Sequence, residues 1–397
     1  MPPIYLDFNA TTPVDPVVAS DIATSLNSHW GNPSSSHEFG RVAHGAIAVA
    51  RQQVADLIGA KPGEIVFTGG GSEASNLAIK GACDRPGFAG PWWKFRHGGL
   101  DPHDCCLIAS AVEHPATAKP IEYLRRRGAT VVTLPVDGTG LVDADAVRMA
   151  LRFNFARFVL VSLMHSNNEV GTLMPIRDVG ALKSRYRFLF HTDCAQSLGK
   201  VAVDANDLNV DLLTIAGHKL YAPKGVGALY VRGGVDLEPL VHGAGHEGGR
   251  RAGTENAPYI VGLGRAAELA RQSLPYETTR LMALRDRLHG KLKDGLGERI
   301  ALNGHESLRL PNTLNVSFLG QLGPVLLSNI PRIAASVGSA CHETKAGEAS
   351  FKPSPVLVAM KRSVEACRGA VRLSLGRTTT EAEVDEAAEL LIRAAKS

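Results

Sequence analysis

The sequence predicts an α/β protein with a mostly parallel sheet, because short apolar runs alternate with helical patterns from about residue 42 to residue 231. Strands that are apolar along their whole length are typical of a sheet covered by helices on both faces. The length of 397 residues exceeds what one core usually holds, so we expect a second domain. We place the large domain at residues 16–260 and a smaller α+β domain at residues 1–15 and 261–397.

Each expected strand is a short apolar run, and each expected helix has apolar residues three or four positions apart. The strands fall at residues 65–67, 106–109, 131–134, 158–161, 188–191, 212–216 and 228–231. The helices fall at residues 42–58, 117–127, 143–151 and 179–186, with a further helix starting at Ser72. Residues 84–104, which contain Pro, Gly and two Trp, indicate a surface insertion. A long helical pattern from about Ala257 to about Leu296 leads into a mixed strand-and-helix region.

Composition and charge are those of an ordinary globular enzyme. Hydrophobic residues make up 44% and charged residues 21%, and the net charge of +4 indicates neither a nucleic-acid partner nor a membrane surface. The N-terminus lacks a basic region followed by an apolar core, so we expect no signal peptide. Six cysteines without Cys-x-x-Cys spacing argue against a disulfide framework and a zinc site. We therefore expect a cytoplasmic enzyme without a metal.

Polar residues follow the expected strands at several places, where ligands of open α/β sheets bind. They are Gly69–Ser72, Glu113-His114, His165–Glu169, Asp193 and His218-Lys219. The glycines before a helix start suit either a phosphate or a tight turn. Each group alone is compatible with a loop histidine, an Asx turn or a helix cap. Together, a histidine, an amide pair, an acid and a lysine at one sheet edge indicate a functional site.

With these residues in place, the chain resembles the NifS/IscS-type cysteine desulfurases and the related selenocysteine lyases. The resemblance covers nearly the whole chain and rests on many motifs in one order. They are Tyr5-Leu6-Asp7, Ala10–Pro13, Gly31–Ser35, Glu113-His114, Asn167–Glu169, His191–Asp193, His218-Lys219, Gly253-Thr254, Gly338–Cys341 and Arg372–Ser374.

The resemblance implies a fold-type-I enzyme that uses pyridoxal 5'-phosphate, with a seven-stranded sheet in its large domain. Lys219 would hold the cofactor and later move protons, and Asp193 would pair with the pyridine nitrogen. His114 would stack on the ring, while Asn168 and Gln196 would reach its phenolic oxygen.

The resemblance also implies a homodimer and a substrate site. The phosphate would be held by Gly71, Ser72 and His218, joined by Thr254 from the other subunit. The substrate would be bound by Arg372, which would grip its carboxylate, and by Asn32.

Cys341 would attack the substrate sulfur or selenium according to the same resemblance. Its surroundings support that role independently, because residues 342–348 are polar and a cysteine that delivers sulfur elsewhere suits an exposed loop. Free cysteines are usually buried, and that interpretation fits Cys83, Cys194 and Cys367 better. Cys105-Cys106 is ambiguous, with strand entry as the simpler interpretation.

Our first hypothesis is a cysteine desulfurase that converts L-cysteine to L-alanine and leaves a persulfide on Cys341. A selenocysteine lyase, converting L-selenocysteine to L-alanine and selenide, is close behind because of the 84–104 insertion and Ala216 before the lysine. An aminotransferase gives Cys341 no task, and a sulfur- or metal-binding module fits the scattered cysteines poorly. The sequence leaves open the cysteine or selenocysteine preference, the acceptor protein, and the pathway: iron–sulfur cluster assembly, thionucleoside synthesis or selenium recycling.

Overall fold

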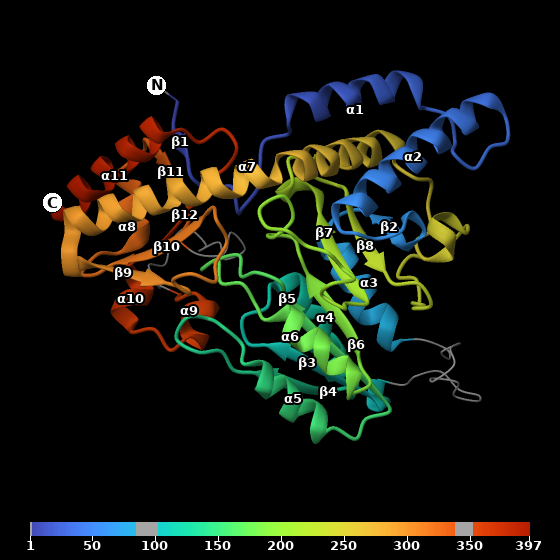
Figure 1. The fold of residues 1–397 in the computed structure, drawn as a ribbon, viewed down its shortest axis with the longest axis horizontal. Coiled ribbons are helices and arrows are strands. Elements are labelled where there is room, and N and C mark those ends of the chain that lie inside the picture. Colours follow the sequence, from blue (N-terminus) through green and yellow to red (C-terminus); the bar gives the residue numbers. More distant parts are fainter. Residues whose placement is uncertain (1, 85–101, 338–351) are drawn as a thin grey trace.

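A seven-stranded sheet forms the centre of the computed structural model, which describes residues 2–84, 102–337 and 352–397 (Figure 1). The strand order is β2-β8-β7-β6-β5-β3-β4, and β8 alone runs antiparallel to its neighbours. The carboxyl ends of β2, β7, β6, β5 and β3 therefore meet at one edge of the sheet. The strands are β2 (Ile65–Thr68), β3 (Cys105–Ser110), β4 (Thr130–Leu134), β5 (Phe158–Met164), β6 (Leu189–Asp193), β7 (Leu212–Ala216) and β8 (Gly227–Val231).

Helices cover both faces of this sheet, because alternate strand residues point to opposite sides. Leu107 packs into the cluster that includes α3 (Gly71–Cys83) and α4 (Pro115–Arg126), whereas its neighbour Ile108 packs into the opposite cluster. The opposite cluster includes residues of α1 (Pro16–Ser28), α2 (Glu38–Leu57), α5 (Ala144–Arg152), α6 (Ile176–Ala181) and the first half of α7 (Ala257–Leu296).

A separate apolar cluster lies beyond the large sheet. It packs the second half of α7 and α11 (Glu381–Lys396) against an antiparallel sheet of β9 (Ile300–Asn303), β10 (Thr313–Phe318) and β12 (Ala370–Ser374). β1 (Ile4–Tyr5) pairs in parallel with β11 (Ile333–Ala334) at the same cluster. The short helix α8 (Gly323–Ser328) packs into this cluster. Two other short helices, α9 (Pro355–Ala359) and α10 (Val364–Gly369), contribute buried residues to the cluster of the large sheet instead. The domain boundaries themselves stay a prediction.

The elements confirm the expected α/β fold with two differences. The helix expected at residues 179–186 is wrong in extent, because α6 ends at Ala181 and Leu182–Ser184 tightens into a 3₁₀ turn, as helix ends often do. We did not predict α1, although its start carries a recognisable signal. Asp15 caps it through the N–H of Val17, and Pro16 occupies its first position. Most of the 84–104 insertion lies outside the described residues.

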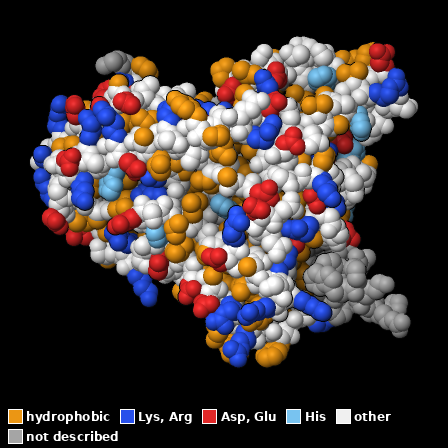
Figure 2. Space-filling view, viewed as in Figure 1, with side chains coloured by type: hydrophobic (Ala, Val, Ile, Leu, Met, Phe, Trp, Pro, Cys, Tyr) orange, Lys and Arg blue, Asp and Glu red, His pale blue; other side chains and the backbone are white. Residues whose placement is uncertain are grey.

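The surface carries charges of both signs. On the face drawn in Figure 2, Lys and Arg side chains are interspersed with Asp and Glu. Within the described ranges, no helix combines the length and hydropathy that a membrane crossing needs.

Candidate active site

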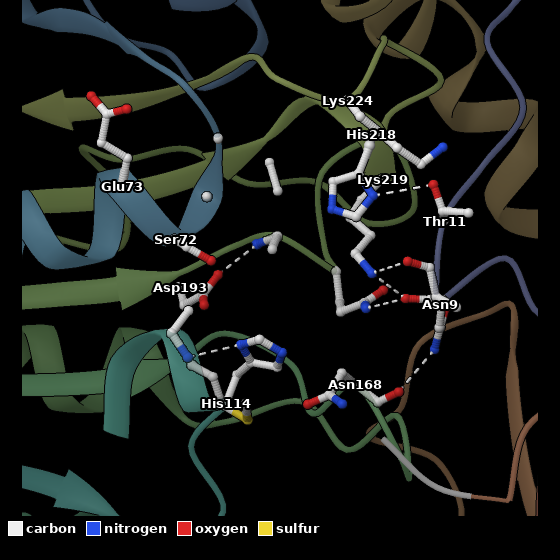
Figure 3. A pocket seen from close by; sticks show the side chains of 18 of the residues that line it. Asn9, Thr11, Ser72, Glu73, His114, Asn168, Asp193, His218, Lys219 and Lys224 are labelled. Atoms are coloured by element: carbon white, nitrogen blue, oxygen red, sulfur yellow. Dashed lines mark hydrogen bonds between the residues drawn. The ribbon is translucent and has the colours of Figure 1, made fainter. Parts of the chain in front are cut away.

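A cavity of about 610 Å³ opens where the carboxyl ends of the parallel strands meet (Figure 3). Its lining includes Gly69–Ser72 after β2, His114 after β3, Asn168 after β5, Asp193 at the end of β6, and His218-Lys219 after β7. The structure therefore brings most of the predicted polar groups together at one site, whereas Glu113, His165 and Glu169 do not line this cavity.

Lys219 extends into this cavity from the 3₁₀ turn Gly217–Lys219. Its Nζ donates hydrogen bonds to the backbone carbonyl oxygens of Asn9 at 2.5 Å and Ala10 at 2.6 Å. Figure 3 shows the side chain pointing toward Asn9. The amine is thus held in one place at the cavity wall, where it can react with an aldehyde.

Asp193 is a buried carboxylate that faces the same cavity, with 7% of its surface exposed. Burial raises its pKa from 3.8 to about 6, although the N–H of Ala195 and the charge of Lys219 act in the opposite direction. That N–H donates to Oδ1 at 2.9 Å. Asp193 forms no ion pair with any described residue. A cationic group of a ligand would supply the positive partner that this carboxylate lacks among the described residues.

His114 presents a neutral imidazole to the cavity. It caps α4, where Pro115 takes the first helical position, and its Nδ1 accepts the N–H of Ala116 at 3.1 Å. Burial, followed by the charge of Lys219, lowers the pKa of His114 to about 4. An uncharged, flat ring of this kind suits stacking on an aromatic ligand.

The start of α3 forms a cradle for an anion. Gly70 has φ 148°, which favours glycine, and no side chain caps the helix. A Cβ added at Gly71 would lie 2.9 Å from the Cβ of Ala216, so the backbone approaches β7 too closely for a larger residue. Ser72 adds a hydroxyl to these free N–H groups, and the helix dipole favours negative charge.

Two basic side chains flank the anion cradle from the loop after β7. His218 is linked through Nδ1 to the Thr11 hydroxyl at 3.2 Å, and Lys224 also lines the cavity (Figure 3). Burial and then the charge of Lys219 lower the pKa of His218 to about 4, so it presents a neutral ring to the cavity.

Arg372 contributes a guanidinium from β12, with 1% of its surface exposed. Its Nη2 pairs with Asp7 Oδ1 at 2.7 Å, and its Nη1 donates to the Asn168 carbonyl oxygen at 3.0 Å. Its Nε is buried without a partner. The guanidinium is therefore fixed in orientation and keeps donors available for a carboxylate.

Sequence reasoning missed Asn9, which contacts the site from the N-terminal segment. Its carbonyl oxygen accepts from Lys219 and from Gln196 Nε2, the latter at 2.9 Å, and its side chain donates to Thr313 Oγ1 at 2.8 Å. Lys200, also missed, donates to Gln196 Oε1 at 3.0 Å. Neither position carries a recognisable local signal. An asparagine after Phe8 is typical of an ordinary turn, and Lys200 stands in a turn as well.

Two residues with an expected site role, Asn32 and Thr254, do not line this cavity. Asn32 and Thr254 are exposed and lie away from it in their own chain. Cys341 lies outside the described residues. Their roles stay predictions.

Comparisons with known proteins agree with this geometry. The family model described as Aminotransferase class-V matches residues 4–387. The Cysteine desulfurase IscS of Dictyoglomus turgidum (strain DSM 6724 / Z-1310) is 40% identical over 392 residues, or 98% of this chain and 94% of that protein. The protein of the same name from Methanosarcina thermophila is 41% identical over 391 residues, covering 98% and 91%. A solved structure of a NifS-like protein superposes with a TM-score of 0.84 at 32% identity, covering 98% of both chains.

Proposed function

The chain belongs to the aminotransferase class-V family, and from that premise we propose that it is a pyridoxal-phosphate-dependent cysteine desulfurase. The reaction converts L-cysteine to L-alanine and transfers the sulfur to a cysteine of the enzyme. The named relatives and the NifS-like structure support this function across nearly the whole length of the chain.

One observation carries the cofactor assignment: a buried carboxylate without an ion pair among the described residues, Asp193, shares a cavity with the amine of Lys219. Pyridoxal phosphate, when bound, supplies an electron sink for negative charge at the substrate α-carbon. Asp193 would hold a proton on the ring nitrogen, which also satisfies its own buried charge. Lys219 would hold the aldehyde carbon and carry a proton at Nζ.

The remaining cavity groups fit the other parts of the cofactor. Gly71, Ser72 and His218 would hold the phosphate, because all three line the cavity and the first two stand at the start of α3. His114 would cover one face of the ring and exclude water from it. Asn168 and Gln196 would contact the phenolic oxygen.

Arg372 would bind the substrate carboxylate, because it lines the cavity and its guanidinium is held in orientation by Asp7 and the Asn168 carbonyl oxygen. Cys341 would take the sulfur as a persulfide and pass it to an acceptor protein, and Asn32 would contribute to substrate binding. We further propose a homodimer in which Thr254 of each chain reaches the phosphate bound by the other. The exposure of Thr254 in its own chain is compatible with that role.

The test is to load the purified protein with pyridoxal phosphate, reduce it with borohydride and map the labelled peptide. The label should lie on Lys219 and disappear in Lys219→Ala, while Lys224→Ala, a change at another lysine of the same cavity, should keep it. The loaded protein should release alanine from L-cysteine, and Cys341→Ala should abolish sulfur transfer while keeping the visible band. A label on another lysine, or release of a 2-oxo acid in place of alanine, would contradict the proposal. Parallel assays with L-selenocysteine measure the preference that the sequence leaves open.

A further inference from the structure

Lys200 is a buried lysine that contacts Gln196 of the cavity wall, and the proposed function gives it no task. It lies in the turn that follows β6, with 6% of its surface exposed. It forms no ion pair with the described residues; its Nζ contacts Gln196 Oε1 at 3.0 Å and Asn9 Oδ1 at 3.4 Å. Burying an ammonium without a carboxylate costs stability. Lys200 therefore does not stabilise the fold through an ion pair with the described residues, and its hydrogen bonds are what connect it to the site.

The contact with Gln196 determines which way the glutamine amide faces. A charged lysine can only donate, so the amide end next to Lys200 must be the oxygen. The NH₂ end then points the other way, where it donates to the Asn9 carbonyl oxygen at 2.9 Å. Its second N–H has no acceptor among the described residues, and Gln196 lines the cavity. Without the lysine, the broad, two-fold terminal torsion of glutamine would let the amide turn over.

We propose that Lys200 is a positioning residue of this site, which holds the Gln196 amide so that its NH₂ donates to the bound cofactor. The inference rests on the proposed function, because the acceptor is the phenolic oxygen of pyridoxal phosphate. Lys200 does not touch the reacting atoms and acts through Gln196.

Asn9 extends the effect to the reactive amine. Its carbonyl oxygen accepts from both Gln196 and Lys219, and its side-chain oxygen accepts from Asn312 at 3.0 Å and from Lys200. A change at Lys200 therefore alters two contacts of Asn9, the one with Lys200 itself and the one with Gln196. Asn9 in turn accepts a hydrogen bond from the Lys219 amine.

The charge on Lys200 responds to its surroundings. Burial, followed by the charges of Lys219 and Arg372, lowers the pKa of Lys200 to about 7. Above that pH the neutral amine can also accept a hydrogen bond, so its hold on the amide orientation weakens. The narrow cavity beside Lys200 is also lined by the polar side chains of Lys219, Tyr221, Glu277 and Arg377.

The experiment compares Lys200→Met, which keeps the apolar stem but removes the donor, with Lys200→Arg, which keeps a donor. In the loaded protein, Lys200→Met should shift the pH midpoint of the visible band and lower kcat by about tenfold, the effect of one lost hydrogen bond. Lys200→Arg should restore part of both. Lys183→Met is the matched control, because Lys183 is also largely buried but pairs with Asp211 and does not line the cavity. It should leave the band unchanged.

A second comparison tests whether the effect passes through Gln196. In a Gln196→Leu background, Lys200→Met should change the band and kcat much less than it does in the wild type, because only the longer contact of Lys200 with Asn9 Oδ1 remains to be lost. Gln196→Glu keeps a partner for Lys200 but removes the NH₂, so it should shift the band even where Lys200→Met fails to fold. An unshifted band in Lys200→Met or in Gln196→Glu, or a full additional effect in the double variant, would overturn the inference. A wild-type protein without a label on Lys219 would refute the proposed function and this inference with it.

Discussion

Replacing Asp193 by asparagine should stabilise the apo-protein at pH 8 by up to about 3 kcal/mol. The side chain is buried, and its pKa rises from 3.8 to about 6 because the folded protein disfavours its charge. At about 1.4 kcal/mol for each pKa unit, this rise corresponds to the stated free energy. Asparagine has nearly the same shape, and its oxygen can still accept the N–H of Ala195.

The gain should depend on pH in a defined direction. The folded protein binds the Asp193 proton more tightly than the unfolded chain, so the free energy of unfolding falls as pH rises from 3.8 through about 6. The difference between the variant and the wild type should therefore be absent below pH 3.8, reach about half its full size at pH 5, and be complete by pH 8.

Urea unfolding of both apo-proteins at pH 5 and pH 8 measures this difference. Added pyridoxal phosphate should stabilise the wild type more than the variant, because only the carboxylate can pair with a cationic ring nitrogen. A variant that is less stable than the wild type at pH 8, or a difference that is equal at the two pH values, would refute the reasoning.

Three further predictions concern neighbouring groups. Arg372→Lys should raise the KM for cysteine by about tenfold in steady-state assays without shifting the visible band. A lysine ammonium cannot bind Asp7 and a substrate carboxylate at the same time, as the planar guanidinium can. An unchanged KM would argue against carboxylate binding. Gly71→Ala should weaken cofactor binding by about tenfold in absorbance titrations, because its Cβ would lie 2.9 Å from the Cβ of Ala216. Gly63→Ala is the control, because the space around Gly63 is open, and it should leave the affinity unchanged. Equal affinities of the two variants would argue against an anion site at the start of α3. Glu113→Gln should leave the free energy of unfolding nearly unchanged near pH 4.5 and raise it progressively toward pH 8, because burial raises the pKa of the Glu113 carboxyl to about 8. In urea unfolding, a difference between variant and wild type that does not change with pH would count against that pKa shift.

Much of the fold was predictable because its signals are local. Each strand of the large sheet is an apolar run between polar turns, and the strand ends marked the positions of Asp193 and Lys219 before their contacts were known. Parallel pairing brings those ends to one edge, so residues far apart in the chain converge without any direct signal between them. The family motifs then assigned roles that the spacing alone left open.

Other parts of the site had no local signal. Asn9 reaches its partners across 159 to 365 residues of sequence, and nothing in its neighbours distinguishes it from an ordinary turn asparagine. Lys200 lies at the end of a turn, and none of its neighbours in the sequence predicts that its amine is buried. The orientation of the Gln196 amide depends on that amine, and therefore on packing.

The sequence by itself determined the alternation of strands and helices and the polar groups at the strand ends, because hydrophobic periodicity and turn chemistry act over a few residues. Only the tertiary structure decided that Asp193 is a buried carboxylate without an ion pair among the described residues, and that Asn9 joins Lys219 to Gln196. Burial and long-range hydrogen bonding depend on how all the layers pack together, and no short stretch of the chain encodes them.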